Sequence, residues 1–280
     1  MKSKITNGET EYLFTADVLG KYPVKYYQCR DSGFIQTEDA YWLPEAYSTA
    51  ITSLDIGLLY RNIKLAGAVE KIISNNFNSD GQFLDYAGGY GIFTRLMRDN
   101  GYQFFHDDQF CEDLFAKHFE LTNVAKPYNF ELVTAFEVFE HLANPLEEIK
   151  KIFEYSDSVL FSTELVPDKK IASPNDWWYI VPETGQHIAF YTRKSLEIIG
   201  KKLGLTLYSN NANLHLFSRK STMASTIATD LANPFAELQR PKNSFLKNLF
   251  KHRGSRQIIA QRESLLQQDF EYVKEIISKK

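Results

Sequence analysis

The fold is decided by one run of sequence, Phe83-Leu-Asp-Tyr-Ala-Gly-Gly-Tyr-Gly-Ile-Phe-Thr-Arg-Leu-Met97. A short apolar segment ends in Asp85, and small residues follow before a helical pattern begins. The small residues are Ala87, Gly88, Gly89 and Gly91. Such a turn lets a ligand lie against bare backbone, and the next helix offers unpaired N–H groups at its positive end. The run predicts a strand, a tight turn and a helix, with a ligand at the turn.

Acidic residues follow the next two predicted strands. Asp108 stands 17 residues after Gly91, at the end of the apolar segment 102–107. An acid at this point of a doubly wound sheet is placed to bind the ribose hydroxyls of an adenosine. A further buried strand is predicted at 131–136, and polar residues come after it, namely Glu137, Glu140 and His141.

On these residues the chain resembles the class I S-adenosylmethionine (SAM) methyltransferases. Asp85-x-Ala-Gly-Gly-x-Gly91 is similar to their nucleotide loop, and Asp108 to their ribose acid. Glu137-Val-Phe-Glu-His-Leu-x-x-Pro145 is similar to the segment after their fourth strand. The resemblance implies a SAM-dependent methyltransferase with SAM as cofactor. It implies that the cofactor is bound by Asp85, Ala87, Gly88, Gly89, Gly91, Asp108, Phe136 and Glu137.

A dinucleotide dehydrogenase is the alternative for a glycine loop followed by an acid. Its G-x-G-x-x-G fingerprint would require a glycine at the position of Thr94. An acid such as Asp85 is also unfavourable beside a pyrophosphate, whereas SAM carries a sulfonium and an ammonium and no phosphate. The residues therefore favour SAM.

The expected fold class is α/β, a doubly wound Rossmann-like sheet that ends in an antiparallel β-hairpin. Strands are predicted at 82–86, 103–107, 131–136 and 158–163, and the hairpin at 205–209 and 213–219. Helices are predicted at 110–119, 145–155 and 193–203, and a long helical region at 43–75. Because Asp85 and Glu137 are only 52 residues apart, the third strand of the usual sheet is expected to be short or missing.

The chain divides into three predicted parts. They are an N-terminal β segment (1–44), a methyltransferase domain with a helical cap (45–220), and a basic C-terminal helical extension (221–280). The first part resembles the remnant of the zinc module of some sugar and polyketide methyltransferases. Ser32 stands where a thiolate would accompany Cys29, and no His, Asp or Glu group shows ligand spacing, so no metal is expected. For the basic extension, packing on its own domain, contact in a homodimer or with a partner protein, and membrane association are all left open.

Composition is that of an enzyme with a full core. The 280 residues are 44% hydrophobic, and the net charge of −3 gives no bias toward nucleic acid or a membrane surface. No run approaches the roughly 20 apolar residues that span a bilayer. With two cysteines there is no disulfide framework, so a cytoplasmic location is expected.

Methyl transfer to a hydroxyl or a carbon acid requires that the acceptor be held in line with the donor and lose a proton. His187 is the first candidate for the general base and His141 the second. His187 belongs to a segment that resembles the Gly-x-His-x-x-Phe/Tyr motif of SAM enzymes acting on sugars and small metabolites.

The same segment is rich in aromatic and polar residues, as sites that hold sugars often are. The predicted acceptor-binding residues are Trp177, Trp178, Tyr179, Glu183, Gln186 and Tyr191, together with Tyr47 and, less directly, Arg61 and Asn62. Each aromatic residue taken singly also fits a place in the core. A sugar or sugar nucleotide of a surface polysaccharide pathway is the leading acceptor. The alternatives are a quinone, polyketide or lipid precursor, or an inactive SAM-binding or scaffold subunit.

Overall fold

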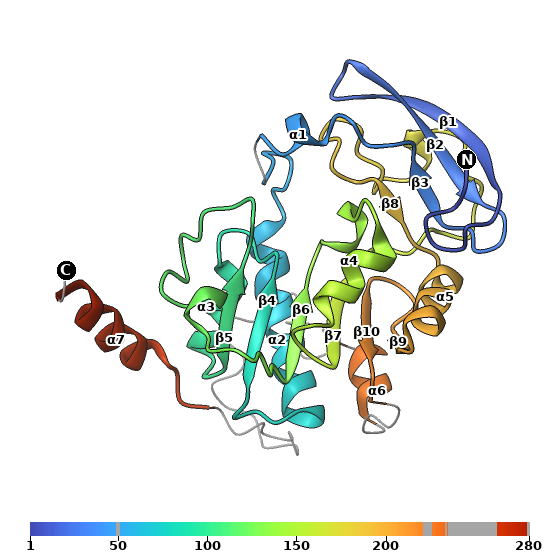
Figure 1. Ribbon diagram of the computed structural model, residues 1–280. Helices are drawn as coiled ribbons and strands as arrows, with labels where there is room; N and C mark the ends of the chain where they lie inside the picture. The colour runs from blue at the N-terminus through green and yellow to red at the C-terminus, as the bar shows by residue number, and fades with distance from the viewer. Residues whose placement is uncertain (49–50, 221–225, 233, 235–261, 279–280) are drawn as a thin grey trace, which may run out of the picture.

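A computed structural model describes residues 1–48, 51–220, 226–232, 234 and 262–278. Its main sheet has six strands in the order β5-β4-β6-β7-β10-β9 (Figure 1). They are β4 (Gln82–Tyr86), β5 (Gln103–Asp107), β6 (Leu132–Ala135), β7 (Ser158–Ser162), β9 (Thr206–Ser209) and β10 (Leu214–Ser218). The first four of these pair in parallel, and β10 pairs antiparallel with both β7 and β9. The predicted Rossmann-like sheet with a final antiparallel hairpin is confirmed.

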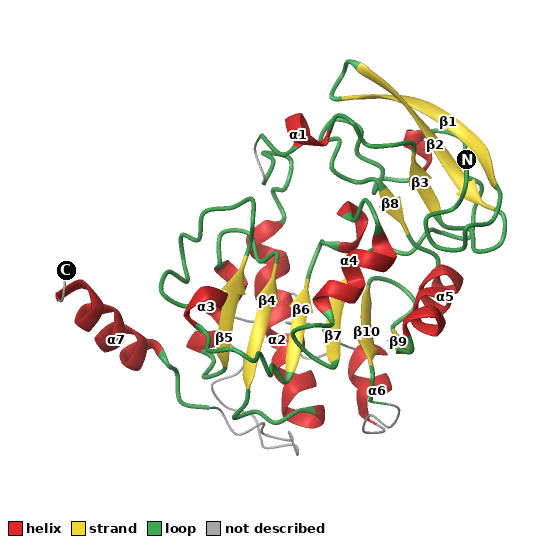
Figure 2. Ribbon diagram, in the orientation of Figure 1, coloured by secondary structure: helices red, strands yellow, loops and turns green. Residues whose placement is uncertain are grey.

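Helices cover both faces of this sheet (Figure 2). Helices α2 (Leu58–Asn76), α3 (Ile92–Asp99) and α6 (Thr226–Ala232) pack on one face, and α4 (Pro145–Ile152) and α5 (Arg193–Leu203) on the other. The neighbours Leu132 and Val133 of β6 belong to the two different cores. Successive side chains of a strand point to opposite faces, so a continuous apolar strand serves both layers.

The segment between β5 and β6 differs from the prediction. No strand forms there, as the short spacing indicated, but the helix predicted at 110–119 is wrong. Residues 110–119 form bends and turns instead, and the short 3₁₀ helix η1 (Leu121–Asn123) follows them. Asp108 and Asp113 each accept hydrogen bonds from the backbone N–H groups two and three residues later. These local bonds compete with helical ones, which explains the difference.

The helical region predicted at 43–75 is interrupted. Helix α1 (Leu43–Ala46) ends early, and α2 begins only at Leu58. The residues between them include Thr52, Ser53, Asp55 and Gly57, which favour turns over helix. The interruption matters because this stretch borders the pocket described below.

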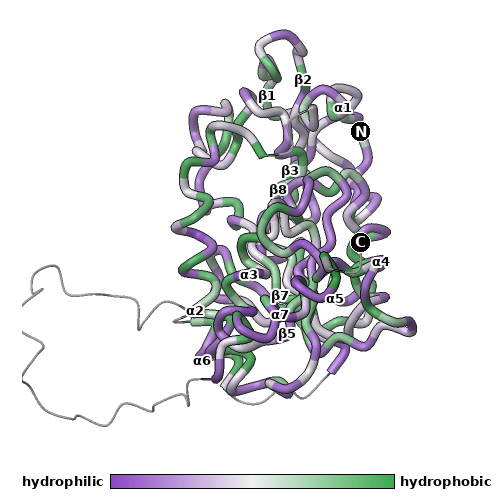
Figure 3. Tube along the Cα trace, turned by 90° about the vertical axis from the view of Figure 1, so that its left-hand side faces the viewer, coloured by the Kyte–Doolittle hydropathy of each residue, from purple (hydrophilic) through white to green (hydrophobic). Residues whose placement is uncertain are grey.

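The N-terminal segment forms a second, antiparallel sheet in the order β1-β2-β3-β8. Its strands are β1 (Thr10–Val18), β2 (Tyr22–Cys29), β3 (Ile35–Thr37) and β8 (Ala189–Phe190). Strand β8 comes from the chain after β7 and pairs with β3 through Ile35 and Phe190. In the side view of Figure 3, β1 and β2 lie at the end of the molecule opposite to α6. The N-terminal sheet therefore fixes part of the long segment that follows β7.

The described C-terminal residues reach back to α3. Helix α7 (Leu266–Ser278) places Asp269 against Arg98, whose Nε and Nη2 atoms donate to the carboxylate at 2.8 and 2.6 Å. The basic stretch at 238–262 lies outside the described residues, apart from Arg262. In the described part of the chain, no helix combines the length and the apolar composition that crossing a bilayer demands.

Candidate active site

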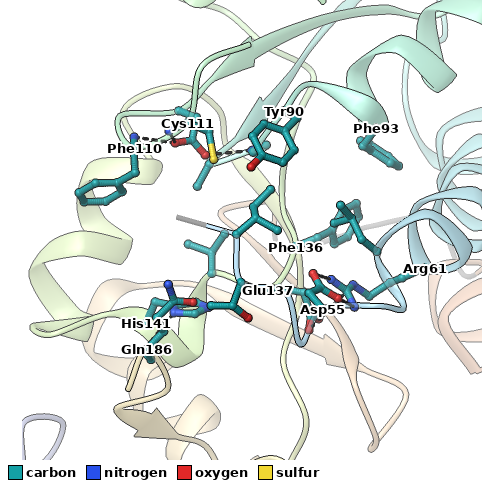
Figure 4. A pocket seen from close by; sticks show the side chains of 18 of the residues that line it. Asp55, Arg61, Tyr90, Phe93, Phe110, Cys111, Phe136, Glu137, His141 and Gln186 are labelled. Carbon is teal, nitrogen blue, oxygen red and sulfur yellow. Dashed lines mark hydrogen bonds and ion pairs between the residues drawn. The ribbon is translucent and has the colours of Figure 1, made fainter. Parts of the chain in front are cut away.

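A cavity of about 420 Å³ opens at the carboxyl ends of β4, β5 and β6. In parallel α/β sheets this edge is the usual place for a ligand. The loops after these strands line it, together with α2 and the segment after β7 (Figure 4). Figure 4 shows His141 and Gln186 on one side of the pocket and Tyr90 and Cys111 on the opposite side.

The glycine loop after β4 forms the bend that the sequence predicted. Gly91 has φ +81° and is the N-cap of α3, a backbone conformation that side chains rarely adopt. A Cβ atom at Gly91 would lie 2.4 Å from Asp113 Oδ1, and one at Gly88 would lie 2.3 Å from Asp85 Oδ2. Glycine is thus required at both positions, and the loop lies directly on the acids beneath it.

Asp85 lies under this loop and is only 1% exposed. The hydroxyl of Thr134 donates to Oδ1 at 2.9 Å, and that of Thr94 donates to Oδ2 at 3.3 Å. Burial raises the pKa of Asp85 to about 6, although His106 nearby favours the ionised form. Asp85 therefore supports the loop from below, and its direct contact with the cofactor stays a prediction.

Asp108 borders the cavity and is bonded to the loop. Its Oδ2 atom accepts from the N–H of Gly89 at 2.9 Å, and its Oδ1 atom accepts from the N–H groups of Phe110 and Cys111 at 2.7 and 2.8 Å. A carboxylate has about four acceptor positions, and these bonds occupy three of them, so one position on Oδ2 remains to accept from a ribose hydroxyl. Asp107 borders the same cavity, and burial raises its pKa.

Several pocket residues were not assigned from the sequence. They are Ile51, Thr52, Leu54, Asp55, Leu58, Leu65, Tyr90, Phe110 and Cys111. Phe110 and Cys111 come two and three residues after Asp108, and this position in sequence is the signal that indicates that they line the pocket. Arg61 and Asn62 do line the pocket, but the Arg61 guanidinium is paired with Asp55 at 2.8 and 3.1 Å.

Phe136 and Glu137 follow β6 and line the pocket as predicted. Glu137 has φ +55°, and the Ser162 hydroxyl donates to its Oε1 atom at 2.6 Å. Its Oε2 atom lies 4.0 Å from Arg61 Nε. Burial and the neighbouring charge of Glu140 raise the pKa of Glu137.

The structure brings the two predicted histidines together. The rings of His141 and His187 lie 5.0 Å apart, and both line the pocket. Nδ1 of His187 lies 2.8 Å from the carbonyl oxygen of Tyr179, and Nδ1 of His141 lies 3.1 Å from that of Gln186. A carbonyl only accepts, so each Nδ1 carries the hydrogen and each Nε2 keeps an open lone pair. Burial lowers the pKa of His187 and, helped by His187, lowers that of His141 to about 3, so both rings are neutral.

Glu140 is a third, fully buried residue next to the two histidines. Its side chain is 0% exposed, and burial raises its pKa to about 7. One potential ligand atom from each of Glu140, His141 and His187 lies within 4.8 Å of the other two. The expectation that no metal is required was based on spacing in sequence, and it stays a prediction. Spacing did not reveal this group, because β8 brings His187 back to a segment 46 residues earlier.

The predicted acceptor residues separate into two sets. Trp178, Tyr179, Gln186 and Tyr47 line the pocket, and Trp178 is 71% exposed. Trp177 and Tyr191 were predicted to bind the acceptor, but both are buried in the core at 6% and 0% exposure. The backbone at Trp177 is extended, so its side chain points away from that of Trp178. Glu183 was also predicted to bind the acceptor, but this exposed residue does not border the cavity.

Tyr191 has a positioning role instead. Its hydroxyl donates to the carbonyl oxygen of Phe139 at 2.9 Å, and the N–H of Ile188 donates to that of Glu140 at the same distance. These bonds join the segment of His187 to η2 (Phe139–His141). The N-terminal sheet holds the same segment through β8, so it contributes to the site without lining it.

Comparison with known proteins identifies the family. The family described as "Methyltransferase domain" matches residues 60–210, more than half of the chain. The chain belongs to this methyltransferase family. Its membership confirms the prediction of a methyltransferase domain. Among curated proteins, none matches the chain.

Solved structures with similar folds include several methyltransferases. OxaC in complex with sinefungin and meleagrin is 18% identical, with a TM-score of 0.39, over 54% of this chain and 46% of its own. The plantazolicin methyltransferase BpumL is 9% identical, with a TM-score of 0.44, over 64% of this chain and 93% of its own. An O-methyltransferase family 2 protein from Planctomyces limnophilus in complex with apigenin is 13% identical, with a TM-score of 0.43, over 62% of this chain and 64% of its own. This chain thus spans about half the length of OxaC.

The pocket suits SAM in both shape and charge. The loop of Gly88 and Gly89 leaves bare backbone at the cavity, and Asp107, Asp108 and Glu137 present carboxylates to it. Carboxylates accept hydrogen bonds from ribose hydroxyls and attract the positive groups of the methionine part. The residues present therefore fit the cofactor.

Proposed function

We propose that the protein transfers the methyl group of SAM to a hydroxyl of a small polar acceptor. When bound, SAM supplies a methyl carbon activated by a positively charged sulfur. Asp108 holds the ribose in this proposal, and Glu137 and the glycine loop hold the methionine part. The acceptor hydroxyl lies at the open Nε2 atoms of His187 and His141.

The observation that carries the proposal is the pair of neutral histidines in the same cavity as the glycine loop. A hydroxyl must lose its proton as it attacks, and neutral imidazoles with fixed Nδ1–H groups are suited to promote this loss. His187 is the residue through which the proton is lost, and His141 is the second in line. The carbonyl oxygens of Tyr179 and Gln186 keep the two rings in the required orientation.

A sugar or sugar nucleotide is the proposed acceptor. Trp178 offers an exposed aromatic face at the pocket, and Gln186 is held there by its bond to the carbonyl oxygen of Ala46 at 2.9 Å. A flat apolar ring next to a few fixed polar groups suits the mixed surface of a sugar. Fewer aromatic residues support a sugar acceptor than the sequence predicted, because Trp177 and Tyr191 lie in the core.

A second acceptor class is favoured by exposed apolar residues in the segment that precedes α2. Leu54 lines the pocket and is 58% exposed, and Ile56 beside it is 95% exposed. Apolar residues at the mouth suit a quinone, polyketide or lipid precursor. An inactive scaffold would have no need of the Asp108 contacts, so we retain it only as an outcome of the test.

The test is methyl transfer from labelled SAM to a panel of nucleotide sugars, quinones and polyketide precursors. Labelled nucleotide sugar is expected, and label only in an apolar product would reject the sugar assignment. SAM binding without transfer to any acceptor would support the scaffold. With an active acceptor, His187→Ala should lower turnover about 10²- to 10⁴-fold and leave SAM affinity nearly unchanged. His118→Asn, a half-buried histidine outside the pocket, is the control.

A further inference from the structure

Glu140 has an environment that SAM binding does not explain. Its carboxylate is fully buried, and the hydroxyls of Thr163 and Tyr179 lie close enough to lower its pKa by hydrogen bonding. Among the described residues, however, both carboxylate oxygens and both hydroxyls lack a partner of normal hydrogen-bond geometry. A buried carboxylate in this state is unfavourable unless it is paired or coordinates a metal ion. Glu137 adds a second negative charge nearby.

The two histidines are oriented as metal ligands usually are. A ligating histidine commonly donates its second ring N–H to a backbone carbonyl, which fixes the tautomer and the ring. Both Nδ1 atoms make this contact, to the carbonyl oxygens of Gln186 and Tyr179. Each Nε2 atom is consequently free to coordinate a cation. Sequence-distant segments supply the ligands, and the Ile188–Glu140 backbone bond of 2.9 Å holds these segments together.

We propose that Glu140, His141 and His187 bind one divalent transition-metal cation, to which the acceptor hydroxyl adds as a further ligand. One potential ligand atom of each residue lies within 4.8 Å of those of the other two, and bonds of about 2.0–2.2 Å to one ion require these atoms to move closer together. One carboxylate and two imidazoles suit ions of the Mn²⁺ to Zn²⁺ series better than Mg²⁺ or Ca²⁺, which prefer oxygen ligands. Three protein ligands leave positions open for the acceptor.

The role of the cation in catalysis rests on the proposed function. Coordination makes the acceptor hydroxyl more acidic. The O–H bond breaks, its proton passes to water, and its electron pair stays on the oxygen and forms the new bond to the methyl carbon. The bond between that carbon and sulfur breaks, and its electron pair stays on sulfur. His187 thus promotes the loss of the proton as a ligand of the cation rather than by accepting the proton.

Cation binding is tested first, without any acceptor. The full chain is treated with chelator, dialysed and titrated with Co²⁺, whose visible absorption reports its ligands. We expect one Co²⁺ per chain in the wild type and in His118→Asn, and none in Glu140→Gln or His187→Gln. Calorimetric binding of S-adenosylhomocysteine shows that each variant is folded. Absence of Co²⁺ from the wild type, or equal binding by Glu140→Gln, would overturn the cation site.

Thermal unfolding gives an independent readout. Mn²⁺ should raise the Tm of the wild type, because a ligand that binds only the folded state stabilises it. Glu140→Gln should not respond to Mn²⁺, because it lacks the carboxylate proposed to bind the cation. A wild-type Tm that is unchanged by Mn²⁺ counts against the proposal.

Activity separates this inference from the proposed function. Chelator should abolish methyl transfer, and Mn²⁺ should restore it. Transfer that persists in a chelated, metal-free enzyme would reject the cation site and leave the proposed function intact. Co²⁺ binding at these residues, without transfer to any acceptor, would reject the proposed function and leave the cation site intact.

Discussion

The Oδ2 atom of Asp108 accepts a hydrogen bond of 2.9 Å from the backbone N–H of Gly89. The acid after β5 is therefore joined directly to the glycine loop after β4. Two features that the sequence predicts separately, a ribose acid and a cofactor loop, form one unit in the folded protein. Replacing Asp108 should therefore remove the predicted ribose contact and also the hydrogen bond to the glycine loop.

Replacing Asp108 with alanine should weaken SAM binding by about 1–3 kcal/mol, because a charged acceptor of hydrogen bonds is lost. Calorimetric titration with SAM measures the change. Asp107→Ala is the matched control, since Asp107 borders the cavity and bonds to the loop only through its backbone carbonyl, which accepts from Gly88 N–H at 3.2 Å and is kept in the variant. Unchanged affinity in Asp108→Ala, with a native circular dichroism spectrum, would remove the ribose assignment. A larger loss in Asp107→Ala would transfer it to Asp107.

The neighbouring tryptophans should behave in opposite ways. Trp178→Ala should raise the acceptor KM roughly fivefold, corresponding to about 1 kcal/mol of stacking, and leave stability nearly unchanged. Trp177→Ala should lower the free energy of unfolding by about 3–5 kcal/mol, because it leaves a cavity in the core of the N-terminal sheet. Steady-state kinetics and urea unfolding of both variants test the pair. A destabilised Trp178→Ala beside a stable Trp177→Ala would contradict the assignment.

Asp269→Ala should release α7 and destabilise the protein by about 3 kcal/mol, because it removes the buried partner of Arg98. Arg95 lies 2.9 Å from the same carboxylate and loses that contact too, but it keeps its ion pair with Asp99. Hydrogen exchange of 266–278 should accelerate in this variant. Glu271→Ala, which changes an exposed residue of the same helix, should retain slow exchange. Equal exchange in Asp269→Ala and the wild type would show that this ion pair does not hold the helix.

Asp85 should make stability depend on pH. Burial raises its pKa to about 6 from an ordinary value of 3.8, so folding favours the protonated carboxyl. Its contribution to stability is complete below pH 3.8 and is lost as the pH rises through about 6. Asp85→Asn cannot ionise, so its free energy of unfolding relative to the wild type should increase between pH 4 and pH 6. Urea unfolding without SAM measures it, and a difference that stays constant over this range would contradict the assignment.

The parts of the fold that were predicted from sequence depend on local order along the chain. Helix α5 occurs at the predicted residues, and β4 and β5 match the predicted strands. Apolar runs bounded by glycine and acid suffice to locate such elements. The helix predicted at 110–119 failed because side-chain bonds of Asp108 and Asp113 to nearby N–H groups replaced helical bonds. Apolar periodicity does not register that competition.

The candidate site was predicted only in part, for a similar reason. The cofactor loop and Asp108 lie at strand ends, so the order of elements places them at the pocket. Which side of an extended segment faces the pocket depends on what packs against it, and so Trp177 and Trp178 were not distinguished. Arg61 could be suspected as a pocket residue, but its ion pair with Asp55 depends on the turn between α1 and α2.

The sequence by itself determined the strand, turn and helix of 83–97, the acids after β5 and β6, and the final hairpin, because each follows from neighbours in the chain. Tertiary structure alone decided the meeting of Glu140, His141 and His187. It depends on β8 pairing with β3 and on the backbone bond from Ile188 to Glu140, which join segments far apart in sequence. Burial of the Glu140 carboxylate is likewise a consequence of packing, since only the folded chain removes it from water.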